Sequence, residues 1–304
     1  MINLFIRISV GLLLLSKTTF SMEWFTQCVD YISSRTGSTR YMPVDRDVLN
    51  QAPYSGCGVI ISYFNDLDHP DVPLTFLSTG FVIGKSSVMT AAHSLFLKES
   101  RREDIEKKGR DFSKIERFSY CVKFVPADVA ALNNFENDEE PVFSSKNDFC
   151  LVHFDYDFDT HVFEFKTAPC SKDVTKIGVE KMGYPSFSDQ ESNKNNVYST
   201  KFSIASCIKK MLLLYNHVTY SGESGSPIVD LETKKVIGMH IGILGVQGTG
   251  IFFSADKATY IKKSLERSKT LFKYSGEMTL FLSEYSDKIC RYNTFLTECQ
   301  QHMI

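Results

Sequence analysis

The chain has 304 residues, enough for one large domain or two small ones, and 43% of them are hydrophobic, as in an ordinary globular protein. Its formal net charge of −2 gives no basic face of the kind that nucleic-acid-binding proteins present, so no nucleic-acid partner is expected. No two cysteines have CxxC spacing. Cys150 and His153, three apart in an expected strand, would face opposite sides, so we expect no metal site.

The N-terminus has the pattern of a secretory signal peptide. Arg7 precedes the short apolar run 8–15, and polar residues follow as far as Ser21. The run is too short to span a bilayer as a helix, which disfavours the alternative of an uncleaved membrane anchor. We therefore predict that residues 1–21 are removed and that the mature protein is secreted or periplasmic. It would meet a membrane only through this segment before cleavage.

All eight cysteines lie beyond that segment. An even number of cysteines in an exported chain predicts disulfide bonds, but the sequence does not give their connectivity. The cysteines are Cys28, Cys57, Cys121, Cys150, Cys170, Cys207, Cys290 and Cys299.

Residues 22–52 are polar and irregular and form either an N-terminal arm or a removable pro-segment. A first β-domain is expected over residues 53–168. Its segments rich in β-branched and aromatic residues, separated by turn sequences, predict strands at 56–64, 74–83, 87–91, 117–125 and 147–154. Between them, the stretch 97–118 carries alternating charges of both signs and is expected to form a solvated helix or loop.

A second β-domain is expected over residues 169–255. Its predicted strands are 175–182, 197–207, 211–219, 235–243 and 249–254. Because no helical period separates these short strands, the fold class is all-β, with two barrels or sandwiches. Residues 256–304 are assigned to a C-terminal helix and a helical extension, since apolar residues recur there every three or four positions. The extension would cap the domain or dock a partner.

The heptad Ser221–Pro227 places a serine on a turn ahead of an apolar strand. Gly222 and Gly225 allow backbone angles that a Cβ would forbid. The amides of Gly222 and Ser224 can then point at one spot and stabilise an oxyanion. Taken alone, the heptad is equally well explained as a Gly/Ser turn between two strands.

Two other residues supply what a nucleophilic serine needs. His93 follows the strand 87–91 among small residues, and Asp148 opens an apolar strand, where it can reach a neighbouring ring. Each alone has a structural alternative, a core histidine or a turn aspartate. Together, the histidine can take the proton of Ser224 and the aspartate can fix the tautomer of that histidine. The three residues therefore predict a catalytic triad.

Three segments resemble the motifs of chymotrypsin-like serine proteases, namely Thr90–His93, Asn147–Val152 and Gly222–Pro227. The resemblance covers about residues 53–270 and implies two six-stranded antiparallel β-barrels with the active site between them. No Ile-Val-Gly-Gly-like start is present, so activation by a newly formed N-terminus is not supported. Glu223 stands where the family usually has aspartate or asparagine, and its longer side chain needs a new partner or disturbs the turn.

The resemblance also implies the roles of the site residues. His93 would be the general base and acid, Asp148 would orient it, and Ser224 would form the acyl-enzyme, with the amides of Gly222 and Ser224 as the oxyanion hole. The protein would be a serine endopeptidase acting on protein or peptide substrates, without metal or organic cofactor. One alternative is a catalytically silent homologue that only binds, and Glu223 is the feature that favours it. Another is a narrow processing protease that docks through the tail helix.

Within the family, the chain resembles the glutamyl endopeptidase branch more closely. The segments that carry this resemblance are Pro53-Tyr54, Gly183–Pro185, Ser226 and Val236–His240. Trypsin-type enzymes carry an aspartate six residues before the nucleophile, where this chain has Val218. Thr219 and His240 correspond to a threonine and a histidine that line the primary specificity pocket of that branch. A hydroxyl and an imidazole can bind a carboxylate or carboxamide oxygen, so the resemblance implies cleavage after Glu or Gln. The alternative for His240 is a core histidine bonded to a backbone carbonyl.

Overall fold

The computed structural model describes residues 42–119, 121–127, 135–136, 142–144, 148–154, 157–166, 174–175, 177–185, 197–208, 212–217, 219–244 and 247–268. All of them belong to one compact unit, residues 41–304. The predicted signal segment, residues 22–41 of the predicted arm and the predicted tail helix from residue 269 onward lie outside the described residues. Within the described ranges, no helix is long and apolar enough to cross a membrane.

The first sheet is antiparallel and has the strand order β6-β5-β2-β3-β4-β8-β7. Alternating burial along β5 leaves one face of the strand on the core, as its β-branched and aromatic residues predict. The strands are β2 (Cys57–Phe64), β3 (Leu74–Gly84), β4 (Ser87–Ala91), β5 (Cys121–Pro126), β6 (Phe135–Glu136), β7 (Val142–Ser144) and β8 (Phe149–His153).

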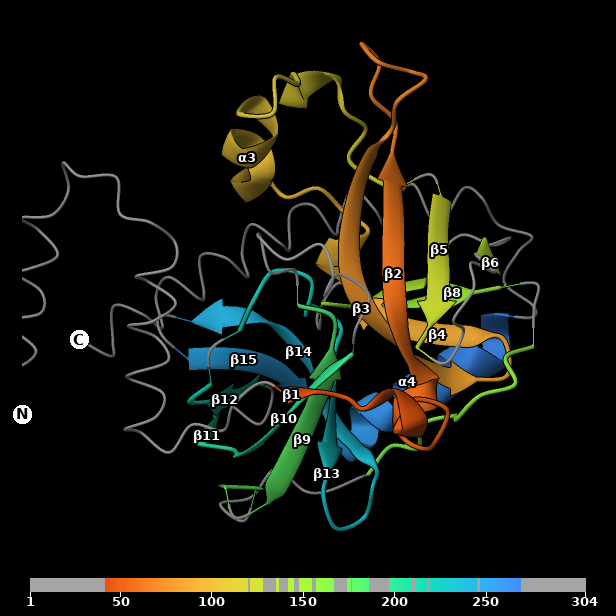
Figure 1. Cartoon of the computed structure of the whole chain (residues 1–304), viewed down its shortest axis with the longest axis vertical. Helices are drawn as coiled ribbons and strands as arrows, with labels where there is room; N and C mark the ends of the chain where they lie inside the picture. The colour runs from red at the N-terminus through yellow and green to blue at the C-terminus, as the bar shows by residue number, and fades with distance from the viewer. Residues whose placement is uncertain are drawn as a thin grey trace, which may run out of the picture. The chain divides into compact units, whose positions relative to one another are not determined.

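The second sheet is also antiparallel and has the order β1-β10-β9-β13-β14-β15-β12-β11. Its strands are β1 (Met42–Pro43), β9 (Gly178–Gly183), β10 (Tyr198–Ser203), β11 (Ser206–Ile208), β12 (Leu212–Tyr215), β13 (Pro227–Asp230), β14 (Val236–Leu244) and β15 (Gln247–Phe252). The predicted all-β class is confirmed, and Figure 1 shows the two groups of strands.

Short edge strands account for the difference from the predicted six strands in each half. Among the described residues, the first sheet has seven strands and the second has eight, and the four strands at their edges, β1, β6, β7 and β11, contain only two or three residues each. Each short strand pairs with backbone N–H and C=O groups at the edge of a sheet, which would otherwise face solvent. In β1, Met42 pairs with Ser199 of β10, so this part of the predicted N-terminal arm is built into the second sheet.

One hydrophobic cluster contains residues of both sheets. Phe81 and Met89 of the first sheet share it with Val229 and Met239 of the second, and all four are at most 1% exposed. Removing this much apolar surface from water is the main favourable term in holding the two sheets together. The candidate site lies beside this apolar junction between the sheets.

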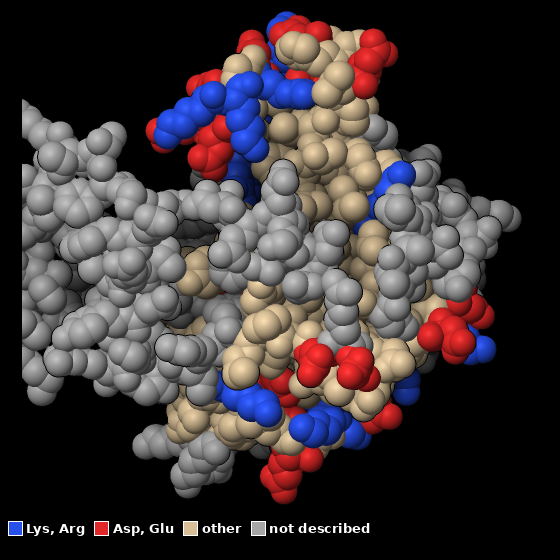
Figure 2. Space-filling view, viewed as in Figure 1, with Lys and Arg blue, Asp and Glu red and all other residues tan. Residues whose placement is uncertain are grey.

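The charged stretch 97–118 is not purely solvated. It forms the 3₁₀ turns η4 (Glu99–Arg101) and η5 (Phe112–Lys114) around the short helix α3 (Arg102–Glu106). Ile105 and Phe112 are buried in one cluster with Phe64 and Leu74 of the β2–β3 hairpin. Figure 1 shows α3 beside this hairpin, and Figure 2 shows basic and acidic side chains mixed over it.

The predicted helix after the second sheet is α4 (Ala255–Ser268). Ile261 is fully buried in the cluster shared by both sheets, and Leu265 packs against that cluster. Tyr260 immediately precedes Ile261 and therefore lies about 100° away from it around the helix, which leaves it 47% exposed. Its ring reaches back to contact Phe149 edge-on.

Candidate active site

The pairing of β4 with β8 brings His93 and Asp148 together. Ala91 of β4 lies opposite Phe149 of β8, so the residues just beyond these strand ends are neighbours. Asp148 has a left-handed backbone, with φ 47°, and its carbonyl accepts from the amide of Ala92 at 3.1 Å. Its carboxylate bonds His93 twice, accepting from the backbone N–H at 3.0 Å and contacting ring atom Nδ1 at 2.8 Å. The aspartate therefore holds both the backbone and the ring of the histidine.

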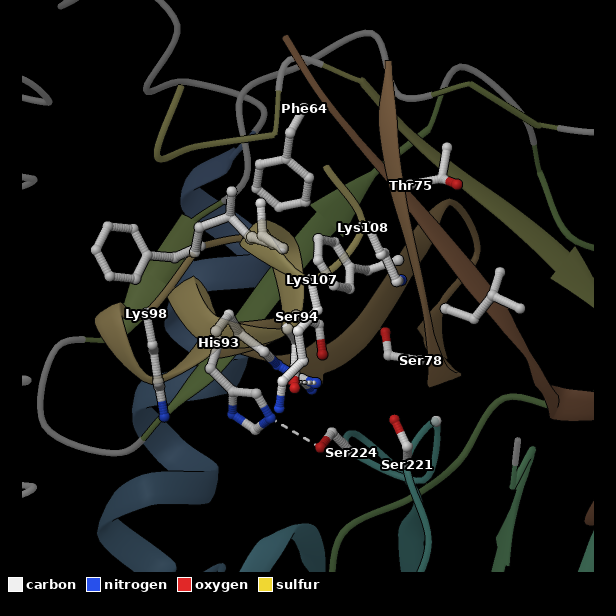
Figure 3. Close-up of a pocket in the computed structure, with 18 residues that line it drawn as sticks. Phe64, Thr75, Ser78, His93, Ser94, Lys98, Lys107, Lys108, Ser221 and Ser224 are labelled. Carbon is white, nitrogen blue, oxygen red and sulfur yellow. Dashed lines mark hydrogen bonds and ion pairs between the residues drawn. The ribbon is translucent and has the colours of Figure 1, made fainter. Parts of the chain in front are cut away.

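Ser224 completes the predicted set. Its Oγ lies 2.7 Å from His93 Nε2, and Figure 3 shows this hydrogen bond from the ring to the serine. Gly222 and Gly225 on either side have φ values of 91° and 92°, which L side chains rarely adopt. A Cβ on Gly225 would lie 2.0 Å from the carbonyl oxygen of Thr79. The predicted need for glycine at these positions thus has a geometric basis.

The electrostatics of His93 and Asp148 favour a neutral base beside an ionised acid. Burial lowers the pKa of His93 below its ordinary value, and nearby Lys98 acts in the same direction, against the raising effect of Asp148. Burial raises the pKa of Asp148, but the charges of His93 and Lys98 outweigh it and bring that pKa to about 2. At neutral pH, His93 is therefore free to accept a proton while Asp148 is ionised.

The backbone of the nucleophile turn leaves two amides available. The carbonyl of Gly222 accepts from Thr79 Oγ1 at 2.9 Å, and the carbonyl of Ser224 accepts from the Thr79 amide at 2.9 Å. Within the described part of the chain, the N–H groups of Gly222 and Ser224 donate to no backbone acceptor. The turn therefore offers two hydrogen-bond donors beside Ser224, as an oxyanion hole requires.

The charged stretch 97–118 forms one wall of a cavity beside His93 and Ser224. The cavity has a volume of about 450 Å³ and is lined by His93, Gly222 and Ser224. Its outer walls come from 75–78 of β3 and from the basic residues Lys98, Arg101, Lys107 and Lys108, together with Asp104 (Figure 3).

Thr219 and His240 are buried, at 8% and 1% exposed, and are not among the described residues that line this cavity. The Tyr215 hydroxyl forms a hydrogen bond with His240 Nδ1. Burial lowers the pKa of His240 well below its ordinary value, and Lys181 lowers it further. The ring of His240 is therefore neutral at pH 7.

Glu223 lies fully buried beneath the nucleophile turn, and its partner is another residue that sequence reasoning missed. Its Oε1 is 3.1 Å from the ammonium of Lys181, which is also 0% exposed. A lysine inside a strand usually points to solvent, so the sequence carried no signal for this pair. Among the described residues, no group of His, Cys, Asp and Glu side chains could hold a metal ion.

Comparisons with known proteins identify the family and a similar fold. The family model of the trypsin-like peptidase domain matches residues 78–239. No curated protein matches the chain. A solved Glu endopeptidase in complex with MPD has a similar fold, with a TM-score of 0.55 and 17% identity over 75% of this chain and 96% of that one. The active form of the Rv3671c protease from M. tuberculosis gives a TM-score of 0.49 at 20% identity, over 72% of this chain and 85% of that one.

Proposed function

The chain belongs to the family of trypsin-like peptidase domains and is a serine-type endopeptidase, and we propose that Ser224 is the nucleophile that its substrates acylate. The observation that carries this proposal is the continuous line of hydrogen bonds from Asp148 through His93 to Ser224, at 2.8 and 2.7 Å. A serine hydroxyl is a weak nucleophile unless a positioned base removes its proton.

In the proposed mechanism, Ser224 Oγ attacks the scissile carbonyl carbon while its proton passes to His93 Nε2. The carbonyl oxygen becomes an oxyanion that accepts from the amides of Gly222 and Ser224. Asp148 stays ionised and stabilises the imidazolium through Nδ1. His93 then gives the proton to the leaving amine. A water molecule, activated by His93 in the same way, hydrolyses the ester and restores Ser224.

We propose that cleavage occurs after Glu or Gln. Burial raises the pKa of Tyr215 well above its ordinary value, so the phenol keeps its proton and can donate it to His240 Nδ1. The imidazole hydrogen then sits on Nε2 of His240. The His240 ring also forms a hydrogen bond with the backbone of Thr249. In the proposed complex, a substrate carboxylate or carboxamide oxygen takes the place of that backbone group and also accepts from the hydroxyl of Thr219, whereas an apolar pocket would leave the oxygen unpaired.

A peptide library with all residues at the position before the cleaved bond tests this specificity. We expect the highest kcat/KM for Glu and Gln, and no cleavage by the Ser224→Ala variant. In Tyr215→Phe, His240 loses its hydrogen bond to the Tyr215 hydroxyl. The ratio of kcat/KM for Glu or Gln to kcat/KM for an aliphatic residue should then fall by about tenfold, which corresponds to the loss of one hydrogen bond. Strong wild-type cleavage after Arg, Lys or Phe would refute the roles given to Thr219 and His240.

We also propose that the enzyme is exported, to the outside of the cell or the periplasm, after removal of residues 1–21, and that it carries disulfide bonds. The signal-like N-terminal sequence supports export. Cys207 is disulfide-bonded, whereas Cys57 and Cys150 are buried thiols, so the bonding would be partial. N-terminal sequencing of the protein recovered outside the cytoplasm should begin near residue 22. Retention of the intact chain in the cytoplasm would contradict export.

A further inference from the structure

The buried pair of Lys181 and Glu223 is the most unusual electrostatic feature near the triad. Both side chains are 0% exposed, and the ammonium lies 3.1 Å from Glu223 Oε1. Lys181 comes from the middle of β9, where it pairs with Thr200 on one side and Ile228 on the other. Burying two charges is costly and is tolerated only when each has a partner. Because both side chains are fully buried, the pair cannot serve solubility, and its presence needs another explanation.

Each member of the pair depends on the other for its charge. Burial raises the pKa of Glu223 well above its ordinary value and lowers that of Lys181 well below its own. Contact between opposite charges at this distance in a dry interior favours the charged forms of both. Removing either partner would thus leave the other as an unpaired buried group.

Glu223 connects this pair to the chemistry, because it immediately precedes Ser224. Its second carboxylate oxygen, Oε2, accepts from the backbone amide of Tyr220 at 2.7 Å. Its own carbonyl accepts from the amide of Ser226 at 2.9 Å. The carboxylate therefore closes residues 220–223 into a loop, and the amide of Gly222 belongs to that loop. The carboxylate is thus linked through this loop to one of the two oxyanion donors, and the other is the amide of the next residue, Ser224.

We propose that Lys181 is a positioning residue for the oxyanion hole, whose ammonium holds Glu223 so that the turn around Ser224 is ordered as soon as the chain folds. The cationic partner of Glu223 comes from inside the second sheet, so the turn needs no newly cleaved N-terminus to complete it. The inference rests on the proposed role of Ser224 and extends it to activation. The longer side chain of Glu223 is explained as well, since it reaches the lysine on β9.

The test compares full-length wild type with Lys181→Met, which keeps the length of the side chain and removes its charge. The matched control is Lys201→Met, an exposed lysine on the neighbouring strand β10. For each protein, kcat, KM and the rate of inactivation by a fluorophosphonate are measured and normalised to the folded fraction. We expect Lys181→Met to lower kcat by about 100-fold with little change in KM, the size of effect seen when an oxyanion donor is lost. Lys201→Met should behave as wild type.

A double variant, Lys181→Met with Glu223→Gln, separates positioning from simple loss of stability. Its glutamine can still accept from the Tyr220 amide but carries no charge that needs Lys181. We expect it to recover at least tenfold of the lost kcat and to fold even if Lys181→Met alone does not. The proposal is overturned if folded Lys181→Met has the kcat of wild type, or if the double variant recovers no activity or fails to fold. A wild-type protein that the fluorophosphonate does not label would instead refute the role of Ser224.

Discussion

Burial has the largest effect on the pKa of His93 and lowers it, and two opposite charges act on the ring in addition. Asp148 contacts the ring directly, and Lys98 lies 3.9 Å from the same carboxylate oxygen. The positive charge of Lys98 disfavours the imidazolium and so lowers the pKa of His93. His93 therefore stays neutral, and able to accept a proton, at a lower pH than it would without Lys98.

Replacing Lys98 with methionine should move the acid limb of activity to higher pH. Because the lysine lowers the pKa of His93, its removal raises that pKa, and more of the base is protonated at a given acidic pH. The measurement is kcat/KM from pH 4 to pH 9. Lys114→Met, which removes a lysine from η5, is the control. An acid limb that stays in place or moves to lower pH would show that Lys98 does not act on His93.

At the scale of elements, the nucleophile turn is formed by contacts from several strands. Gly225 donates its amide to the carbonyl of His240 on β14, and Thr79 on β3 bonds the carbonyls of Gly222 and Ser224. Glu223 was the feature that favoured a catalytically silent homologue. With its carboxylate matched by Lys181, it disturbs neither the turn nor the hydrogen bond between His93 and Ser224.

Gly225→Ala should abolish activity, because the new Cβ would meet the Thr79 carbonyl at 2.0 Å and neither backbone can move away freely. The control is Gly109→Ala, since Gly109 also has a positive φ, 76°, but its Cβ would meet nothing within 4 Å. Both variants carry the backbone cost of about 1–2 kcal/mol for a left-handed alanine. Thermal melts and kcat separate the two effects. Equal kcat in the two variants would contradict the packing argument.

The strands and the triad could be predicted because their signals are local. Alternating β-branched residues predicted β2, β3 and β4 to within one residue of the observed bounds. Contacts between residues that are far apart in the chain have no such local signal. The sequence could not place Lys181 against Glu223, because Glu180 and Lys181 are adjacent charged residues of β9 and nothing in the sequence indicates that either is buried. The many charged residues of the stretch 97–118 predicted a solvated segment. The burial of Ile105 and Phe112 against the β2–β3 hairpin was therefore not predicted.

At the scale of the whole molecule, Thr79 joins the two sheets beside the site. Its hydroxyl donates to the Gly222 carbonyl at 2.9 Å and accepts from the Tyr184 amide at 3.0 Å. Its backbone amide donates to the carbonyl of Ser224. Thr79, a fully buried residue of the first sheet, is therefore one of the residues that position the nucleophile, which the second sheet carries.

Thr79→Val keeps the shape of this junction and removes the hydroxyl. The Gly222 carbonyl and the Tyr184 amide would lose their partner, which should cost about 1–3 kcal/mol in the free energy of unfolding. We also expect kcat/KM to fall by about tenfold, equivalent to roughly 1.4 kcal/mol of transition-state stabilisation. Urea unfolding and steady-state kinetics measure the two effects. Thr233→Val, in a surface turn, is the control. Unchanged kinetics would mean that the junction does not position Ser224.

The central claim is that Ser224 is a nucleophile activated by His93 and Asp148, and covalent labelling tests it most directly. Residues 22–304 are expressed, incubated with a fluorophosphonate and digested, and the modified residue is identified by mass spectrometry. The account predicts one modified residue, Ser224, in the folded wild type and no labelling of Ser224→Ala. Folded wild type that stays unmodified, or equal labelling of Ser224→Ala, would contradict it.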